Sequence, residues 1–124
     1  MAITLTNQSP VTRSQAQIRT DTHWIVNFFS VDVTGNEVIR ADPGAGQQLV
    51  LEWILLNYPF AATIELNEDD TVILGPFTMT TTSPPLFLDF RGHPYPLAIS
   101  TVLQVDSSGA NILTGVAKGY TIVA

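Results

Sequence analysis

The chain has 124 residues, no cysteine, a formal net charge of −6 and only 13% charged residues against 45% hydrophobic ones. The length indicates one domain, the lack of cysteine excludes disulfides and thiolate metal sites, and the negative charge disfavours binding to nucleic acid. Without a basic leader or a window of roughly 18 apolar residues, we expect a soluble protein made in a cytoplasm, with no membrane contact.

The first 21 residues are polar and rich in Thr, Ser and Gln, with isolated apolar side chains. This pattern fits a disordered terminus, and it fits equally an arm that docks on a neighbour. We therefore divide the chain into an N-terminal arm or lead-in, residues 1–21, and a folded domain, residues 22–124.

The rest of the chain reads as a series of strands separated by turns. Runs rich in aromatic and β-branched residues predict strands at 23–33, 37–41, 47–58, 62–67, 71–78, 86–90, 97–105 and 111–123. Gly75-Pro76 interrupts one of them, which indicates a bulge or an edge strand. About eight short strands without a helical window predict an all-β, single-domain antiparallel β-sandwich of the jelly-roll type.

The segment 49–56 is apolar on both faces of its predicted strand. Regular alternation places Leu49, Leu51, Trp53 and Leu55 on one face and Val50, Ile54 and Leu56 on the other, where only Glu52 is polar. One core covers one face, so the second face needs another layer or another copy of the protein. The low content of charged residues gives two alternatives for the surface, which is either wetted by uncharged polar residues or covered by a partner.

No constellation of catalytic residues is visible. His23 and His93 are the only histidines and lack metal-binding spacing, and no serine lies in a nucleophile elbow. Residues 67–70 (Asn-Glu-Asp-Asp) have the length of a hairpin turn and lack the pattern of a calcium loop. We therefore expect no enzyme, no metal and no cofactor. Tyr58 and Tyr95, beside prolines, could bind a sugar, but packing of the loops against the core is the simpler interpretation.

The order of strands and turns from residue 47 to 123 resembles that of small jelly-roll virion proteins of tailed bacteriophages, which trimerise like tumour necrosis factor and decorate or cement capsids. The carrying segments are 49–55, the hairpin 62–66 to 71–77, and the runs 86–90, 96–99 and 113–120.

The resemblance implies a non-enzymatic homotrimer on the capsid surface of a virion, bound to the major capsid protein and stabilising its lattice. It implies that one sheet of each copy faces the three-fold axis, and it assigns core or trimer contacts to five residues: Val50, Trp53, Ile54, Leu56 and Tyr120. The small residues Gly115, Ala117 and Gly119 would let a neighbouring backbone approach closely. For contact with the capsid we predict five residues of the arm: Ile3, Leu5, Val11, Arg13 and Ile18. The alternative is a receptor- or carbohydrate-binding head of a phage fibre or tail.

Overall fold

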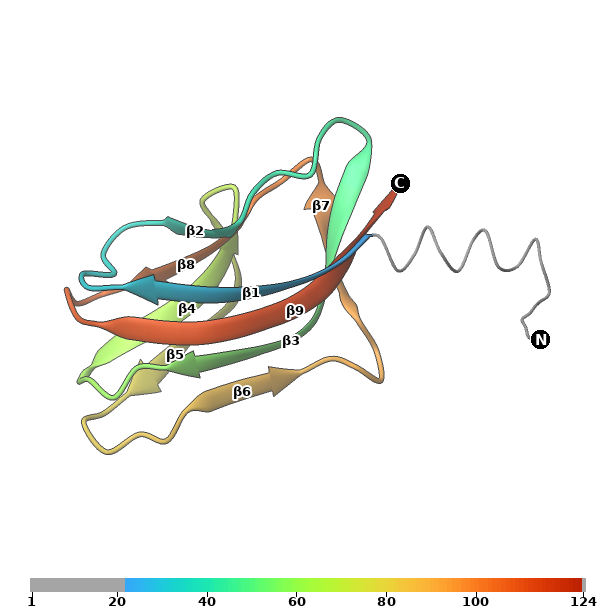
Figure 1. Cartoon of the computed structure of the whole chain (residues 1–124). Coiled ribbons are helices and arrows are strands. Elements are labelled where there is room, and N and C mark those ends of the chain that lie inside the picture. Colours follow the sequence, from blue (N-terminus) through green and yellow to red (C-terminus); the bar gives the residue numbers. More distant parts are fainter. Residues whose placement is uncertain (1–21, 124) are drawn as a thin grey trace.

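The computed structural model describes residues 22–123, and its nine elements are all strands (Figure 1). They are β1 (His23–Ser30), β2 (Glu37–Arg40), β3 (Gln47–Asn57), β4 (Ala62–Glu68), β5 (Thr71–Met79), β6 (Leu86–Asp89), β7 (Tyr95–Ile99), β8 (Leu103–Ser107) and β9 (Leu113–Val123). The predicted all-β class is confirmed. The predicted arm lies outside the described residues. No helix within residues 22–123 is long and apolar enough to cross a membrane.

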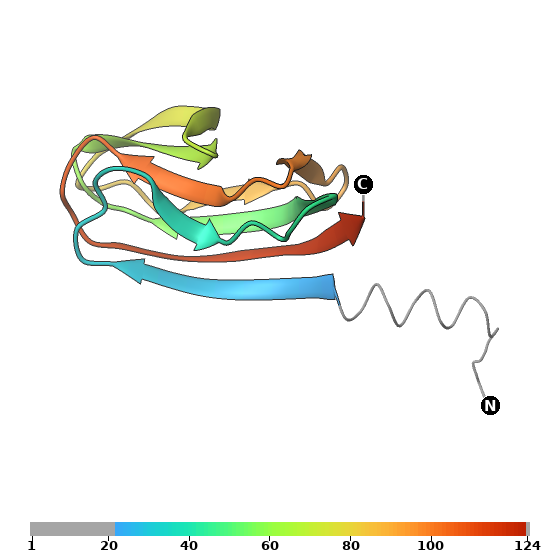
Figure 2. The ribbon, with the colours of Figure 1, turned by 90° about the horizontal axis from the view of Figure 1, so that it is seen from above.

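The strands form two sheets that pack face to face, as the view from above shows (Figure 2). Sheet A has the order β1-β9-β3-β6, with β7 pairing the start of β3, and sheet B has the order β2-β8-β4-β5. All pairs are antiparallel. Four of them are nested along the chain: β1 pairs with β9, β2 with β8, β3 with β6 and β4 with β5. This is a long hairpin rolled over two sheets, the jelly-roll arrangement, and the predicted β-sandwich is confirmed.

The strand predicted at 97–105 is two strands. β7 belongs to sheet A and β8 to sheet B, so the chain must turn between them. It does so at Ser100, which has a φ of 56° and whose backbone N–H donates to the carbonyl of Gln47 over 2.8 Å. The sequence contains no glycine or proline at this turn, which is why the apolar run looked continuous.

A β-bulge at Glu52 changes which residues of β3 face the core. The register with β9 shifts there, because Leu51 lies opposite Gly119 and Trp53 lies opposite Lys118. The bulge inserts one extra residue, so alternation is reset after it. Four side chains consequently point into the core, fully buried: Leu49, Leu51, Ile54 and Leu56. The predicted division of faces is wrong beyond the bulge, since Trp53 and Leu55 belong to the outer face of sheet A with Val50.

The small residues of β9 accommodate aromatic rings of the same chain. A Cβ on Gly115 would lie 2.3 Å from the Phe28 ring, and one on Gly119 would lie 2.6 Å from the Trp24 ring. These glycines therefore face inward and leave room for β1 side chains. The expectation that they admit the backbone of a neighbouring copy is wrong.

Two local predictions about the β4–β5 hairpin are confirmed. β5, which contains Gly75-Pro76, is an edge strand of sheet B. The acidic segment is a tight turn at Asp69 and Asp70, both with positive φ. Asp69 Oδ1 accepts a hydrogen bond from the backbone N–H of Val102, which ties this turn to the turn between β7 and β8.

A candidate interaction face on the outer side of one sheet

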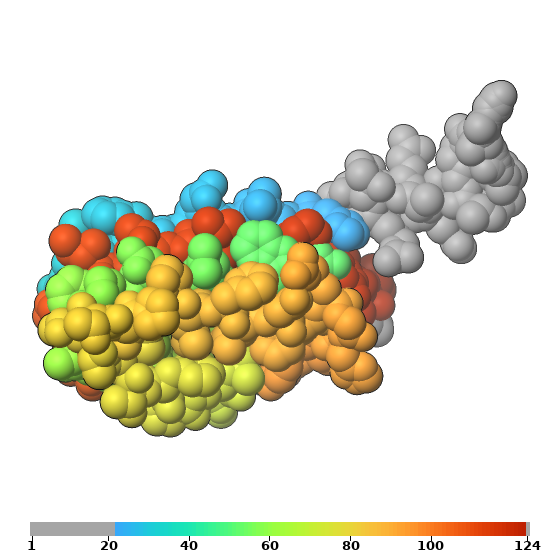
Figure 3. Space-filling view, turned by 90° about the horizontal axis from the view of Figure 1, so that it is seen from below, coloured from blue at the N-terminus to red at the C-terminus, as the bar shows by residue number. Residues whose placement is uncertain are grey.

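The outer side of sheet A is the most unusual surface of the sandwich. Residues that point away from the core come from all four main strands, as the cross-strand pairs show. Its apolar members, which we call the outer apolar face, are Ile25, Phe29, Val50, Trp53, Leu55, Phe87, Val116, Tyr120 and Ile122. Figure 3 shows the molecule from below, with this side seen obliquely along the top, where atoms of β1 (blue), β9 (red) and β3 (green) follow one another.

Several of these side chains are strongly exposed. The exposed fractions are 62% for Ile25, 65% for Phe29 and 47% for Phe87. An antiparallel sheet that meets water normally carries polar residues on that side, and a contiguous apolar patch on a protein surface usually marks an interaction site. The face therefore has the properties of a binding surface.

Leu55 lies at the middle of this face. Its cross-strand neighbours are Val116 on β9 and Phe87 on β6, and the Phe87 ring lies 6.0 Å from the ring of Trp53. Directly opposed pairs of this kind are the units that stabilise a sheet surface. Here they also build a continuous apolar strip across three strands.

One ion pair crosses the strip. Lys118, the only lysine of the chain, pairs with Glu52, the extra residue of the bulge. Lys118 Nζ also lies 3.3 Å from Nδ1 of His23, whose ring stacks on Tyr120 at 5.3 Å between centroids. The opposite charges of Lys118 and Glu52 cancel, so this part of the apolar strip has no net charge.

A second ion pair closes the β6 side of the face. Arg91 donates two hydrogen bonds to Asp89, from Nε to Oδ1 at 2.9 Å and from Nη2 to Oδ2 at 2.8 Å. Its Cζ lies 5.9 Å from the centroid of the Phe87 ring. The hydrogen bonds from the Arg91 side chain lower the pKa of Asp89 to about 2. This bidentate pair marks the rim, because both side chains are exposed to water.

Removing the guanidinium should release the pKa of Asp89. In an Arg91→Gln variant we expect that pKa to rise from about 2 towards its ordinary value of 3.8. Because the pKa of Asp89 is lower in the folded state, its ionised carboxylate stabilises the fold above pH 3.8. This contribution disappears as the pH falls through about 2 and the carboxylate becomes protonated. An NMR titration of the Asp89 carboxyl carbon measures the change, and Arg40→Gln, on sheet B, is the control. An unchanged pKa in Arg91→Gln would contradict the pairing.

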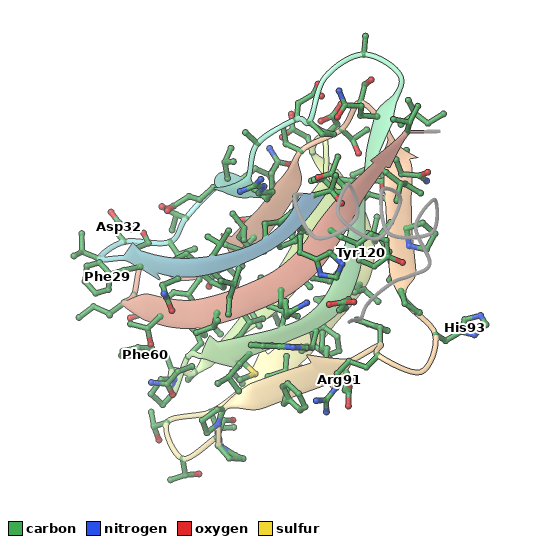
Figure 4. The ribbon with its side chains drawn as sticks, turned by 45° about the vertical axis from the view of Figure 1, so that its right-hand side comes forward. Phe29, Asp32, Phe60, Arg91, His93 and Tyr120 are labelled. Atoms are coloured by element: carbon green, nitrogen blue, oxygen red, sulfur yellow. The ribbon has the colours of Figure 1, made fainter. Side chains whose placement is uncertain are left out.

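Two shallow hollows lie on the face, one at each end. One has a volume of about 320 Å³ and is lined by Asn27, Phe28, Leu55, Asn57, Thr114, Gly115 and Val116. The other, also about 320 Å³, lies where the loop before β7 approaches Tyr120, and it is lined by Val50, Gly92, His93, Pro94, Pro96, Tyr120 and Ile122. Figure 4 shows Tyr120 on β9, His93 on that loop and Phe29 at the far end of β1. Each hollow could receive a protruding side chain from a partner with a complementary surface.

The structure separates the five predicted contact residues into two groups. Trp53 and Tyr120 are half-buried on the outer apolar face, and Val50 lies beneath the second hollow. Ile54 and Leu56 have no exposed surface and lie between the sheets. Of the two predicted roles, core or trimer contact, these two residues have the core role, because the bulge turns them inward. The five arm residues lie outside the described part.

The most exposed members of the face were missed at the sequence level. Ile25, Phe29 and Phe87 were not assigned to any contact. A signal was present in β1, where Phe28 and Phe29 are adjacent. Successive side chains of a strand point to opposite sides, so one ring had to face outward.

Comparisons of the chain with protein-family models, curated proteins and solved structures found no significant match. The site must therefore be interpreted from its own chemistry.

The side chains of the site offer a surface for contact with another protein. Within residues 22–123 no three His, Asp or Glu side chains come together in a way that could hold a metal ion. The loop aromatics pack inward, as the simpler interpretation predicted. Tyr58 is fully buried, and the ring of Phe60 meets it edge-on with 5.3 Å between the ring centroids. The ring centroid of Tyr95 lies 5.6 Å from that of Phe90. The exposed apolar area is concentrated on sheet A, where it can bury against another protein surface.

Proposed function

We propose that this protein is a non-enzymatic structural protein of a bacteriophage virion, which trimerises and binds the outside of the capsid as a decoration or cement protein. The observation that carries the proposal is the outer apolar face of sheet A. A jelly roll of this size needs only one side of each sheet for its core, yet the outer side of sheet A also carries nine apolar side chains among its polar ones. The second side is accounted for if copies meet there around a three-fold axis.

The proposed activity is mechanical. Each trimer bridges neighbouring subunits of the major capsid protein and buries surface that internal pressure would otherwise pull apart. Because the trimer binds the assembled lattice and not the separated subunits, it stabilises the lattice by mass action. Three copies bound together make weak individual contacts sufficient. The net charge of −6 also keeps the protein away from the packaged nucleic acid.

A carbohydrate- or receptor-binding head is the weaker alternative. It requires aromatic side chains that stand free at the loops. The candidate aromatics pack against each other and against the core, with Tyr58 hydrogen-bonded to Ser107 and to the carbonyl of Gly109. No observation on the loops therefore favours this function.

Binding to capsids tests the proposal. The purified full chain, mixed with undecorated capsids of the virus that encodes it, should co-sediment at a fixed number of copies per capsid subunit. Capsids saturated with the protein should also disassemble at a higher temperature than bare ones. Absence of binding at micromolar concentration would refute the decoration role.

The arm gives a separate expectation about capsid contact. Deleting residues 1–20 should abolish co-sedimentation and leave the oligomer intact, because the arm holds Ile3, Leu5, Val11, Arg13 and Ile18, and the outer apolar face lies in the domain. Light scattering and the co-sedimentation assay measure the two properties in parallel. A truncated protein that still decorates capsids would refute the role of the arm.

The middle of the outer apolar face offers a direct test of the trimer contact. We expect Leu55→Asp to fold and to convert the oligomer to single chains, since three carboxylates would enter the contact without partners. The matched control is Val38→Asp, because Val38 is 57% exposed on β2 of the other sheet. Size exclusion with light scattering measures both masses. Equal masses for the two variants would place the contact elsewhere.

A further inference from the structure

The four sides of the sandwich where a sheet ends differ in how well they are protected against strand addition. Unpaired N–H and C=O groups at an edge can pair with another chain, and proteins block this with short strands, charges, bulges and proline. β2 and β6 have only four residues each and end in the charged residues Arg40 and Asp89. β7 contains Pro96, and β5 contains Gly75-Pro76.

β1 has none of these protections. It runs for eight residues, His23–Ser30, without proline, glycine, lysine, arginine or an acidic residue. Its register with β9 is regular over its whole length, so no bulge bends it away. It forms the upper edge of the front sheet in Figure 1, and β9 is its only paired strand within residues 22–123. Alternate residues leave about four N–H and four C=O groups on the free side.

The side chains of β1 complement those of a second β1 running the other way. Directly opposed residues of an antiparallel pair lie on the same face of the sheet. A two-fold axis between two β1 strands must therefore pass through a residue that lies opposite its own copy. Val26 and Asn27 are the two middle residues of β1, so one of them lies on the axis when the overlap is greatest. With Asn27 at the centre, Ile25 lies opposite Phe29 twice. These are the two most exposed apolar side chains of the strand. With Val26 at the centre, Ile25 would lie opposite Asn27, and Phe29 opposite His23.

From these observations we infer that two copies of this protein join through their β1 edges, in antiparallel register with Asn27 opposite Asn27, to form one continuous sheet. Aromatic–aliphatic pairs stabilise such a contact, and an uncharged strand brings no like charges together. The two contacts share Ile25 and Phe29, but this one is centred on the β1 edge and the proposed three-fold one on Leu55 in β3. It would join single chains into dimers, or trimers to one another.

Because the chain has no cysteine, any disulfide between two copies must form at a cysteine introduced by mutation, and it therefore reports the contact at that position. In the inferred register the two Cα atoms of residue 27 lie roughly 4.5–5.5 Å apart, within the range of about 4.4–6.8 Å that a disulfide spans. The full chain carrying Asn27→Cys should form a disulfide-linked dimer in a glutathione redox buffer. We expect the reaction to be at least about tenfold faster than for Thr78→Cys, on the proline-guarded edge β5, since pairing raises the effective thiol concentration.

Further variants fix the register and separate the two contacts. Ile25→Cys mixed with Phe29→Cys should cross-link, and Asn27→Cys mixed with Ile25→Cys should yield mainly the Asn27→Cys homodimer. In a Leu55→Asp background, where the trimer is lost, cross-linking at residue 27 should persist. Cross-linking no faster than in Thr78→Cys, or faster between residues 25 and 27, would overturn the inference. A trimer without this cross-link would leave the proposed function standing, whereas a cross-linked dimer that never forms trimers would contradict the proposed trimer alone.

Discussion

Leu56→Asp is expected to prevent the domain from folding. Leu56 is fully buried between the sheets, opposite Gly115 on β9 and Leu86 on β6. An aspartate there would bury an unpaired carboxylate and also remove a large apolar side chain. Each effect alone costs several kcal/mol, on the order of the whole stability of about 5–15 kcal/mol of a domain. Circular dichroism in the near and far ultraviolet, together with susceptibility to protease, measures the loss.

The neighbouring residue gives the control for this experiment. Leu55→Asp adds the same carboxylate one position earlier, on the outer side of sheet A, and should remain folded. The contrast between the two variants tests the bulge at Glu52 directly. A folded Leu56→Asp protein with reduced oligomer mass would mean that β3 alternates without a bulge and that Leu56 faces another copy.

Gly119→Ala is expected to destabilise the domain by about 3 kcal/mol or more, the upper end of the usual cost of overpacking. A Cβ at this position would lie 2.1 Å from the carbonyl oxygen of Val50 and 2.6 Å from the ring of Trp24. The oxygen belongs to the paired strand β3 and the ring is nearly buried, so neither can move without disturbing the sheet. The shift in the urea midpoint measures the effect.

Gly92→Ala is the matched control, because a Cβ at Gly92 would have no atom within 4 Å and the residue needs no left-handed backbone. It should change the free energy of unfolding by less than about 0.5 kcal/mol. If Gly119→Ala were equally tolerated, Trp24 could not be packed over β9 as described.

The strands and their sandwich arrangement were predictable because turns and β-rich runs are local signals. The Gly75-Pro76 edge and the Asp69-Asp70 turn are examples in which the residues themselves dictate the backbone. What failed were features that depend on pairing partners. Glu52 could not be recognised as a bulge, since a strand that is apolar on both sides keeps the same appearance when its alternation is reset.

The candidate site was predictable only in outline. An apolar second face on the strand of Leu49–Leu56 was rightly expected, but Ile54 and Leu56 were assigned to it in place of Leu55. Gly115 and Gly119 could not be matched to Phe28 and Trp24 without knowing that β1 pairs with β9. Which of the adjacent rings Phe28 and Phe29 faces outward likewise follows from the pairing of β1 with β9, which no local pattern contains.

The central claim is that the outer apolar face of sheet A joins copies of this protein. The most direct test is the solution mass of the full chain, measured by light scattering after size exclusion at several micromolar concentrations. We predict three times the chain mass of 13.5 kDa, or a multiple of that trimer if the β1 edges also pair. A folded protein with the mass of one chain at every concentration would contradict the account, because Ile25, Phe29 and Phe87 would then face water without a partner.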